Sequence, residues 1–222
     1  MASAFIFDID GTLVDSNELH VESWDRAFRR FGKIFPPEAL RAQIGKGSDQ
    51  YLPQFLTADD IERFGAHLDE YRSQVFREDC LPRVRPFPKV RELFERLRED
   101  EKRVVLASSG KKEDTDYYVK KLLKIDNLID GFTCADDAEH SKPQPDIFLA
   151  AIARLDGLPR AEIVCVGDTR FDIEAAARSG LRTIALTCGG TAAEILRAAG
   201  AIAVYHDPAD LLAHYDAAIT AS

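Results

Sequence analysis

The segment Asp8-Ile9-Asp10-Gly11-Thr12 directly follows a short apolar run, Ala4–Phe7. An apolar run that ends in acids and a glycine is typical of a buried strand that carries polar side chains at its carboxyl end. Because side chains alternate along a strand, Asp8 and Asp10 are expected to point the same way. Two carboxylates so close repel each other unless a cation lies between them or one binds a proton. The segment therefore predicts a metal site, a proton carrier or both at the edge of an α/β sheet, with an Asp-rich turn as the alternative.

A calcium-binding EF-hand loop is a competing interpretation with a fixed ligand spacing. Counted from Asp8, Leu13 stands where that loop needs glycine and Leu19 where it needs glutamate. Counted from Asp10, Val14 stands at a ligand position. The spacing excludes an EF-hand in both registers.

Size and charge limit the classes of protein that the chain can belong to. The chain has 222 residues, 45% hydrophobic and 30% charged, which suits one large domain or a domain with an insert. Its formal net charge of -9 argues against unspecific binding to nucleic acid and to anionic membranes. We therefore expect neither nucleic acid nor a membrane as a partner.

The cysteines and the amino terminus indicate a reducing, cytoplasmic location. The four cysteines are widely separated and form no C-x-x-C pair, so neither a zinc site nor a thioredoxin-like motif is expected. Cys165 lies in an apolar run and is expected to be an unreactive core residue. No signal peptide is apparent, and no run approaches the ~18 apolar residues of a membrane span.

Strand and helix patterns alternate through most of the chain, which predicts a doubly wound, mostly parallel α/β sheet. Helical spacing of apolar residues is found in Val90–Leu97 and Phe148–Leu155. Thr191–Glu194 has the pattern of a capping box that opens a helix ending at Gly200, and Asp207 precedes Pro208 as in a helix start. The expected strands are Phe5–Phe7, Val104–Ala107, Gly131–Cys134, Ile163–Val166, Thr183–Leu186 and Ile202–Tyr205.

The segment from Ser16 to about Pro86 interrupts this alternation, because it contains no convincing strand. Trp24, Ala27 and Phe28 make an apolar helical stripe, and Ile61–Phe76 has the pattern of another helix. A long helical insert of this kind predicts a separate lid over the main domain. We expect residues 1–15 and 86–222 to form a Rossmann-like core domain and residues 16–85 an α-helical cap domain.

Further polar residues follow the predicted strands or precede the predicted helices. Ser108 and Ser109 follow one apolar run, Asp168 follows another, and Lys142 stands just before a helix. Parallel strands end on the same side of a sheet, so these side chains should meet Asp8. Each is ordinary by itself: Ser108 or Asp168 suits a helix cap and Lys142 a solvated charge. Their joint occurrence favours a shared site.

The segments at Asp8, Ser108, Lys142 and Asp168, in this order, resemble the four motifs of the haloacid dehalogenase superfamily. The resemblance covers nearly the whole chain. The family pattern D-x-D-G-T is matched by Asp8–Thr12, and the hydroxyl of its second motif by Ser108. Lys142 matches the lysine of the third motif, and Asp168 and Asp172 match the acidic fourth motif. The insert resembles the helical cap of the branch that contains phosphoglycolate phosphatase and β-phosphoglucomutase.

The resemblance implies a role for each motif residue. Asp8 would be the nucleophile that forms an aspartyl-phosphate, and Asp10 would act first as general acid and then as base. Lys142 would neutralise charge and position Asp8. Mg2+ is the implied cofactor, because a carboxylate cannot easily attack an anionic phosphate. Its implied ligands are Asp8, the backbone carbonyl of Asp10 and Asp168, with Asp172 supporting them.

The resemblance also assigns the phosphate to Ser108 and to the amide of Ser109. In the expected cap, Lys46 stands between Gly45 and Gly47, which suits a mobile loop that presents a cation to an anionic substrate. A solvated lysine in a turn is the alternative.

The details of the first motif narrow the reaction. Dehalogenases and phosphonatases of the superfamily lack the second aspartate, whereas Asp10 is present; its ATP-driven pumps carry a lysine where Ile9 stands. The expected activity is a Mg2+-dependent phosphatase acting on a small phosphorylated metabolite, of the sugar phosphate or phosphoglycolate class. We expect a monomer or weak homodimer, and His20 as a packing or hinge residue.

Two alternatives stay open. A β-phosphoglucomutase-like phosphosugar mutase would use the same core residues, although Ser48 stands where such mutases carry an arginine. From another class, a non-catalytic phosphate-binding regulatory protein would be expected to have lost one of the motif residues, and none is lost.

Overall fold

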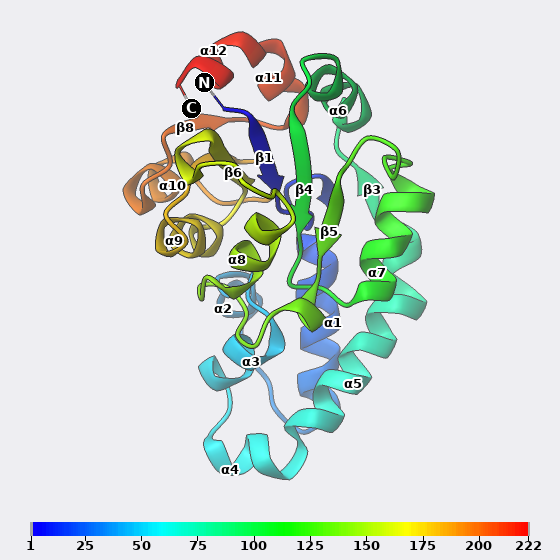
Figure 1. The fold of residues 1–222 in the computed structure, drawn as a ribbon. Helices are drawn as coiled ribbons and strands as arrows, with labels where there is room; N and C mark the ends of the chain where they lie inside the picture. The colour runs from blue at the N-terminus through cyan, green and yellow to red at the C-terminus, as the bar shows by residue number, and fades with distance from the viewer. Residues whose placement is uncertain (1, 222) are drawn as a thin grey trace.

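The computed structural model describes residues 2–221, and within them six strands form one parallel sheet in the order β5-β4-β1-β6-β7-β8 (Figure 1). All six predicted strands are confirmed, and each differs from its predicted bounds by one residue at one of its two ends. The strands are β1 (Ala4–Phe7), β4 (Arg103–Ala107), β5 (Gly131–Thr133), β6 (Ile163–Gly167), β7 (Arg182–Leu186) and β8 (Ala203–Tyr205).

Helices cover both faces of the sheet and bury its two apolar surfaces. On one face, α6 (Val90–Glu99), α11 (Pro208–Ala213) and α12 (Tyr215–Ala221) share a core with Phe5 and Phe7. On the other face, α8 (Asp146–Ala153) and α9 (Arg170–Arg178) share a core with Ala4 and Ile6. This alternation of side chains along β1 confirms the predicted doubly wound α/β fold.

Three helix ends were predicted from sequence: the end of α10 and the start of α11 are confirmed, and the start of α10 is not. α10 (Ala193–Ala199) ends at Gly200 with a φ of 109°, and the Asp207 side chain accepts from the amide of Asp210 at the start of α11. The predicted capping box at Thr191–Glu194 is wrong. The helix begins at Ala193, so Ala192 is the N-cap residue and no side chain caps this end.

Of the remaining helices, α7 (Lys112–Tyr117) follows β4 in the sheet domain, and the others lie beyond the carboxyl ends of the strands (Figure 1). They are α1 (Asn17–Arg30), α2 (Pro37–Arg41), α3 (Ser48–Tyr51), α4 (Ala58–Asp60) and α5 (Ala66–Val75), and residues 58–80 run as one continuous helical stretch. These helices have an aromatic core of their own, in which the Trp24 ring stacks on Tyr51 with centroids 4.3 Å apart and Phe28 is buried beside them. The predicted apolar stripe is thus a packing surface.

The two connections between this helical layer and the sheet run side by side. β2 (Val14–Asp15) and β3 (Arg85–Pro86) form a two-stranded antiparallel ribbon. The expectation that the segment from Ser16 to about Pro86 contains no strand is therefore wrong at the last two residues of that segment, Arg85 and Pro86. The reason is geometric, because the chain leaves and re-enters the sheet at one place and its two extended connections can pair. Among the described residues, no helix has the length and apolar character needed to cross a membrane.

Candidate active site

The carboxyl ends of three neighbouring strands meet at the site. β1 lies between β4 and β6, and the ends of all three are in register. Asp8, Ser108 and Asp168 follow these strands and therefore leave the sheet at the same edge, as the sequence predicts. All three side chains are buried. The fold thus gathers polar groups where open α/β sheets bind ligands.

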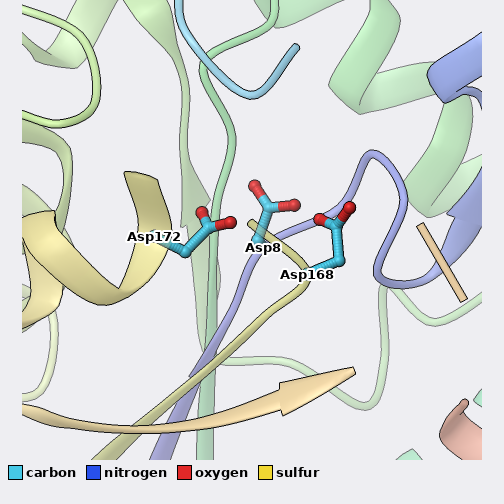
Figure 2. A group of neighbouring side chains, drawn as sticks. All are labelled: Asp8, Asp168 and Asp172. Atoms are coloured by element: carbon cyan, nitrogen blue, oxygen red, sulfur yellow. The ribbon is translucent and has the colours of Figure 1, made fainter. Parts of the chain in front are cut away.

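Three carboxylates form the centre of this edge. Asp8, Asp168 and Asp172, the last in the first turn of α9, place carboxylate oxygens within 4.8 Å of one another. Figure 2 shows them side by side, with Asp8 between the other two. Such a concentration of negative charge away from water requires compensation.

Lys142 supplies the positive charge at this centre. Its ammonium contacts Asp8 Oδ1, lies 2.8 Å from Asp172 Oδ1 and donates to the carbonyl of Ala107 at 3.2 Å. The side chain is only 1% exposed. Burial alone would lower the pKa of Lys142, but Asp172 and Asp8 outweigh it and raise that pKa above its ordinary value. The lysine therefore stays charged.

Thr12 and Asn17 hold carboxylate oxygens that Lys142 does not contact. The Thr12 hydroxyl lies 3.2 Å from Asp8 Oδ2 and 3.1 Å from Asp168 Oδ1, and its single proton can serve only one of them at a time. The Asn17 amide donates to Asp168 Oδ2 at 2.9 Å and to the carbonyl of Gly189 at 2.8 Å. Asp168 is thus oriented from the first residue of α1.

The acids remain undercompensated, as their pKa values show. Burial is the main cause that raises the pKa of Asp8 to about 7; Lys142 opposes the rise, and the charge of Asp172 adds to it. Burial, followed by the charges of Asp172 and Asp8, raises the pKa of Asp168 well above its ordinary value. One ammonium among three buried carboxylates leaves room for further positive charge.

The donor set and its surroundings fit a hard divalent cation. The available atoms are carboxylate oxygens, which Mg2+ and Ca2+ prefer. A Cβ on Gly189 would lie 1.7 Å from Asp168 Oδ2, and one on Gly11 would lie 2.3 Å from it, so the absence of side chains lets the backbone close around this acid. Asp172 is already engaged, since Lys142 holds one oxygen and Thr169 donates to the other. Asp8 and Asp168 are the acids left for a metal.

Asp10 lies next to this cluster but faces the helical layer. Its Oδ1 accepts from Ser16 at 2.6 Å, from His20 at 2.9 Å and from Tyr118 at 3.2 Å. Burial would raise the pKa of Asp10, but the hydrogen bonds from His20, Ser16 and Tyr118 oppose it and lower that pKa. In this arrangement Asp10 is ionised.

The contacts of His20 fix its tautomer. Arg72 Nη2 lies 2.9 Å from His20 Nδ1, and a guanidinium can only donate. Nδ1 therefore accepts, and the proton of the ring is on Nε2, which donates to Asp10 Oδ1. The His20 ring also stacks on Phe76, with centroids 4.1 Å apart. This histidine packs between the layers, as the sequence predicts, and also orients Asp10.

A pocket of about 280 Å³ opens above the acids, between the sheet edge and the helical layer. Ser108 and Ser109 line it: the Ser108 hydroxyl accepts from the amide of Gly110 at 2.9 Å, which leaves its own proton free to donate. Lys46 also lines the pocket, but its ammonium bonds Gln43 at 2.7 Å and lies 4.7 Å from the centre of the Phe171 ring. Lys46 thus reaches the rim of the pocket without an ion pair to the acids among the described residues.

Reciprocal hydrogen bonds hold the loop at residues 42–49 over the pocket. The amide of Gly47 donates to Ser141 Oγ at 2.9 Å, and the amide of Ser141 donates to Asp49 Oδ2 at 3.0 Å. Ser141 precedes Lys142, so the loop is anchored next to the lysine that pairs with Asp8.

A model of the haloacid dehalogenase-like hydrolase family matches residues 5–186. The chain belongs to this family. It is 28% identical to the phosphorylated carbohydrates phosphatase of Thermotoga maritima, over 82% of the chain and 83% of the relative. It is 29% identical to the validoxylamine A 7'-phosphate phosphatase of Streptomyces hygroscopicus, over 84% of the chain and 86% of the relative. The crystal structure of a hydrolase from Pseudomonas syringae superposes with a TM-score of 0.86, at 33% identity, over 97% and 98% of the two chains.

These similarities confirm the predicted superfamily and the predicted fold. They also confirm that the chain is a hydrolase, and its relatives include phosphatases. Members of the haloacid dehalogenase-like family generally use a divalent metal, which agrees with the cluster of Asp8, Asp168 and Asp172.

Sequence reasoning assigned no role to several residues at this hydrolase's site. Ser16 and Asn17 lie four and five residues after Thr12, the last residue of the first motif, and that proximity is the only signal in the sequence. Arg72, Asp114 and Tyr118 line the pocket from helices whose sequences carry no motif.

Proposed function

We propose that this hydrolase is a Mg2+-dependent phosphatase of small phosphomonoesters, and that residues 16–85 act as its cap. The observation that carries the proposal is the buried group of Asp8, Lys142 and Asp168 beneath a pocket that Asp10 also lines. The phosphatase names of the relatives support the same reaction.

In the first step an Asp8 carboxylate oxygen forms a bond to phosphorus, and the bond from phosphorus to the ester oxygen breaks. The leaving oxygen takes a proton from Asp10, which gives an alcohol and an aspartyl-phosphate. In the second step water attacks phosphorus while Asp10 takes its proton. The bond to Asp8 then breaks and releases inorganic phosphate. Lys142 keeps Asp8 in place throughout, and Ser108 with the amide of Ser109 holds phosphate oxygens.

The environment of Asp10 suits a change of protonation state. The three donors on its Oδ1 favour the carboxylate, which the second step needs as a base. Burial is the largest influence on its pKa and acts in the opposite direction. Loss of those donors when substrate binds would therefore raise the pKa of Asp10 and let it carry the proton that the first step needs.

Asp8, Asp168 and the backbone carbonyl of Asp10 would hold Mg2+, with Asp172 kept in place by Lys142 and Thr169. The metal would reduce the repulsion between the Asp8 carboxylate and the anionic phosphate. Lys46 would contribute a cation at the rim of the pocket.

The test is hydrolysis of p-nitrophenyl phosphate in the presence of Mg2+. Asp8→Asn should abolish phosphate release, and excess EDTA should do the same to the wild type. Asp15→Asn is the matched control, because Asp15 is an exposed acid on the same segment. Acid quenching followed by mass spectrometry should find a phosphoryl group on Asp8. An active Asp8→Asn variant would remove Asp8 as the nucleophile, and conversion of β-glucose 1-phosphate without phosphate release would favour a mutase.

A further inference from the structure

Asp10 is held by hydrogen bonds to only one of its two carboxylate oxygens. Oδ1 accepts from Ser16 at 2.6 Å, from His20 at 2.9 Å and from Tyr118 at 3.2 Å. Within residues 2–221, no group donates a hydrogen bond to Oδ2. A Cβ on Gly110, which lines the pocket, would lie 3.9 Å from Oδ2. Oδ2 is therefore the free oxygen, and it lies beside the segment that lines the pocket.

The three donors to Oδ1 come from different layers of the molecule. Ser16 is the N-cap residue of α1 and His20 lies on α1, so both belong to the helical layer. Tyr118 begins the helical turn Tyr118–Leu122, which continues α7 in the sheet domain. Asp10 follows β1 of the same domain. Of the three donors, Tyr118 is thus the one whose distance to Asp10 does not depend on where the helical layer lies.

The Tyr118 side chain is fixed in position and can act only as a donor to Asp10. It is 2% exposed and belongs to the core on one face of the sheet, while its residue also lines the pocket. A phenol keeps its proton at neutral pH, and burial, followed by the charges of Asp10 and Asp114, raises the pKa of Tyr118 further. In the described part of the chain the hydroxyl makes one hydrogen bond, to Asp10 Oδ1.

This contact decides which oxygen of Asp10 can carry a proton. A neutral carboxylic acid has one oxygen that bears the proton and one that only accepts hydrogen bonds. Because Tyr118 donates to Oδ1, the proton of a neutral Asp10 belongs on Oδ2. That oxygen is the one beside Gly110, on the pocket side of the carboxyl group.

We propose that Tyr118 is a positioning residue that fixes Asp10 through Oδ1, and that Oδ2 is the atom that exchanges protons with substrate and water. The proposal rests on the proposed phosphatase function and deepens it. In the first step Asp8 bonds to phosphorus, the bond from phosphorus to the ester oxygen breaks, and Oδ2 gives its proton to that oxygen. In the second step Oδ2 takes a proton from the attacking water. In both steps the hydrogen bond from Tyr118 keeps Oδ2 turned towards the pocket.

The experiment uses Tyr118→Phe, which removes the hydroxyl and keeps the ring, with p-nitrophenyl phosphate, phenyl phosphate and hexyl phosphate as substrates. The p-nitrophenolate leaves without a proton, whereas the oxygen of hexanol needs one from Asp10. The value of kcat/KM covers the steps up to release of the alcohol, so the later attack of water does not enter it. For hexyl phosphate, kcat/KM should fall about 10-fold, because a hydrogen bond to a charged group contributes roughly 10- to 100-fold and two donors remain. For p-nitrophenyl phosphate it should stay within about twofold, with phenyl phosphate between the two.

Tyr117→Phe is the matched control. It removes the same hydroxyl one residue earlier, from a half-buried side chain that does not line the pocket. All three values of kcat/KM should stay unchanged in this variant. A purely structural role of Tyr118 would lower kcat/KM equally for the three esters in Tyr118→Phe. That equal loss, or no loss at all, overturns the proposal while leaving the phosphatase function intact.

Crystal structures of the two variants test the same point without turnover. In Tyr118→Phe the Asp10 carboxylate should rotate away from its wild-type orientation or occupy two orientations, and in Tyr117→Phe it should keep one. A displaced Asp10 supports the positioning role of Tyr118 even if no ester is hydrolysed and the phosphatase function fails. An Asp10 that keeps its wild-type orientation in Tyr118→Phe overturns the proposal.

Discussion

Replacement of Lys142 by methionine tests whether the acid cluster depends on this one cation. Methionine fills a similar volume but removes the ammonium that contacts Asp8 and lies 2.8 Å from Asp172 Oδ1. Breaking a buried ion pair by removing one partner costs about 3–5 kcal/mol, because the remaining charge stays buried. For a chain of this size about 1 kcal/mol corresponds to roughly 2–4 °C, so the melting temperature should fall by about 6–20 °C without metal.

The pH dependence of this loss has a definite sign. Lys142 lowers the pKa of Asp8, which burial brings to about 7, so the pKa in the variant lies above 7. At a pH between about 7 and this higher pKa, Asp8 is protonated in the folded variant. It is ionised in the folded wild type and in the unfolded chain. The stability lost should therefore be largest at pH 9 and shrink towards pH 7, by about 1.4 kcal/mol for each pH unit in this window.

Urea unfolding followed by circular dichroism, in EDTA at pH 9 and pH 7, measures both effects. Lys121→Met is the control, because Lys121 is exposed. Mg2+ should restore part of the stability of the Lys142→Met variant, since a cation would again lie among the acids. A loss below about 1 kcal/mol at pH 9, or a loss independent of pH, would refute the dependence of the cluster on Lys142.

Three further substitutions test the surroundings of the cluster. Asn17→Ala should weaken Mn2+ or Mg2+ binding in calorimetry by roughly 10- to 100-fold, because Asp168 loses the amide that orients it at 2.9 Å; unchanged affinity would contradict that role. His20→Ala should raise the pKa of Asp10 in a carboxyl 13C NMR titration, since burial remains while a donor is lost; no change would mean that the other two donors suffice. Gly189→Ala should cost about 1–3 kcal/mol of unfolding free energy and weaken metal binding, because its Cβ would lie 1.7 Å from Asp168 Oδ2; a fully stable variant that binds metal would show that the loop can move aside.

The sheet could be predicted from sequence because each buried strand is a short apolar run that ends in polar residues. The ends of these strands cannot be predicted to the residue from such runs. The predicted start of α10 is wrong because Thr191, a residue type that often caps helices, lies one position before the actual N-cap residue, Ala192. The meeting of Asp8, Ser108 and Asp168 was predictable for a simple reason: parallel strands deliver their ends to one edge.

The remainder of the site depends on packing between layers. Asn17 contacts Asp168 across 151 positions of sequence, and only the placement of α1 brings them together. Arg72 and Asp114 line the same pocket from α5 and α7, and the sequence of neither helix predicts this pairing. Likewise, the contact of Asp10 with Tyr118 requires α7 to end beside the first strand. Local sequence patterns do not encode such pairings.

The ribbon of β2 and β3 has a consequence for protein engineering. Val14 pairs with Pro86 and Asp15 with Arg85, so the ends of residues 16–85 lie one strand spacing apart. A segment with adjacent ends can be exchanged as a cassette, since any replacement whose termini are equally close reconnects the chain without stretching the sheet. Grafting residues 16–85 from a relative that keeps an asparagine at the position of Asn17 should therefore hold Asp8, Lys142 and Asp168 in place while changing what the pocket recognises.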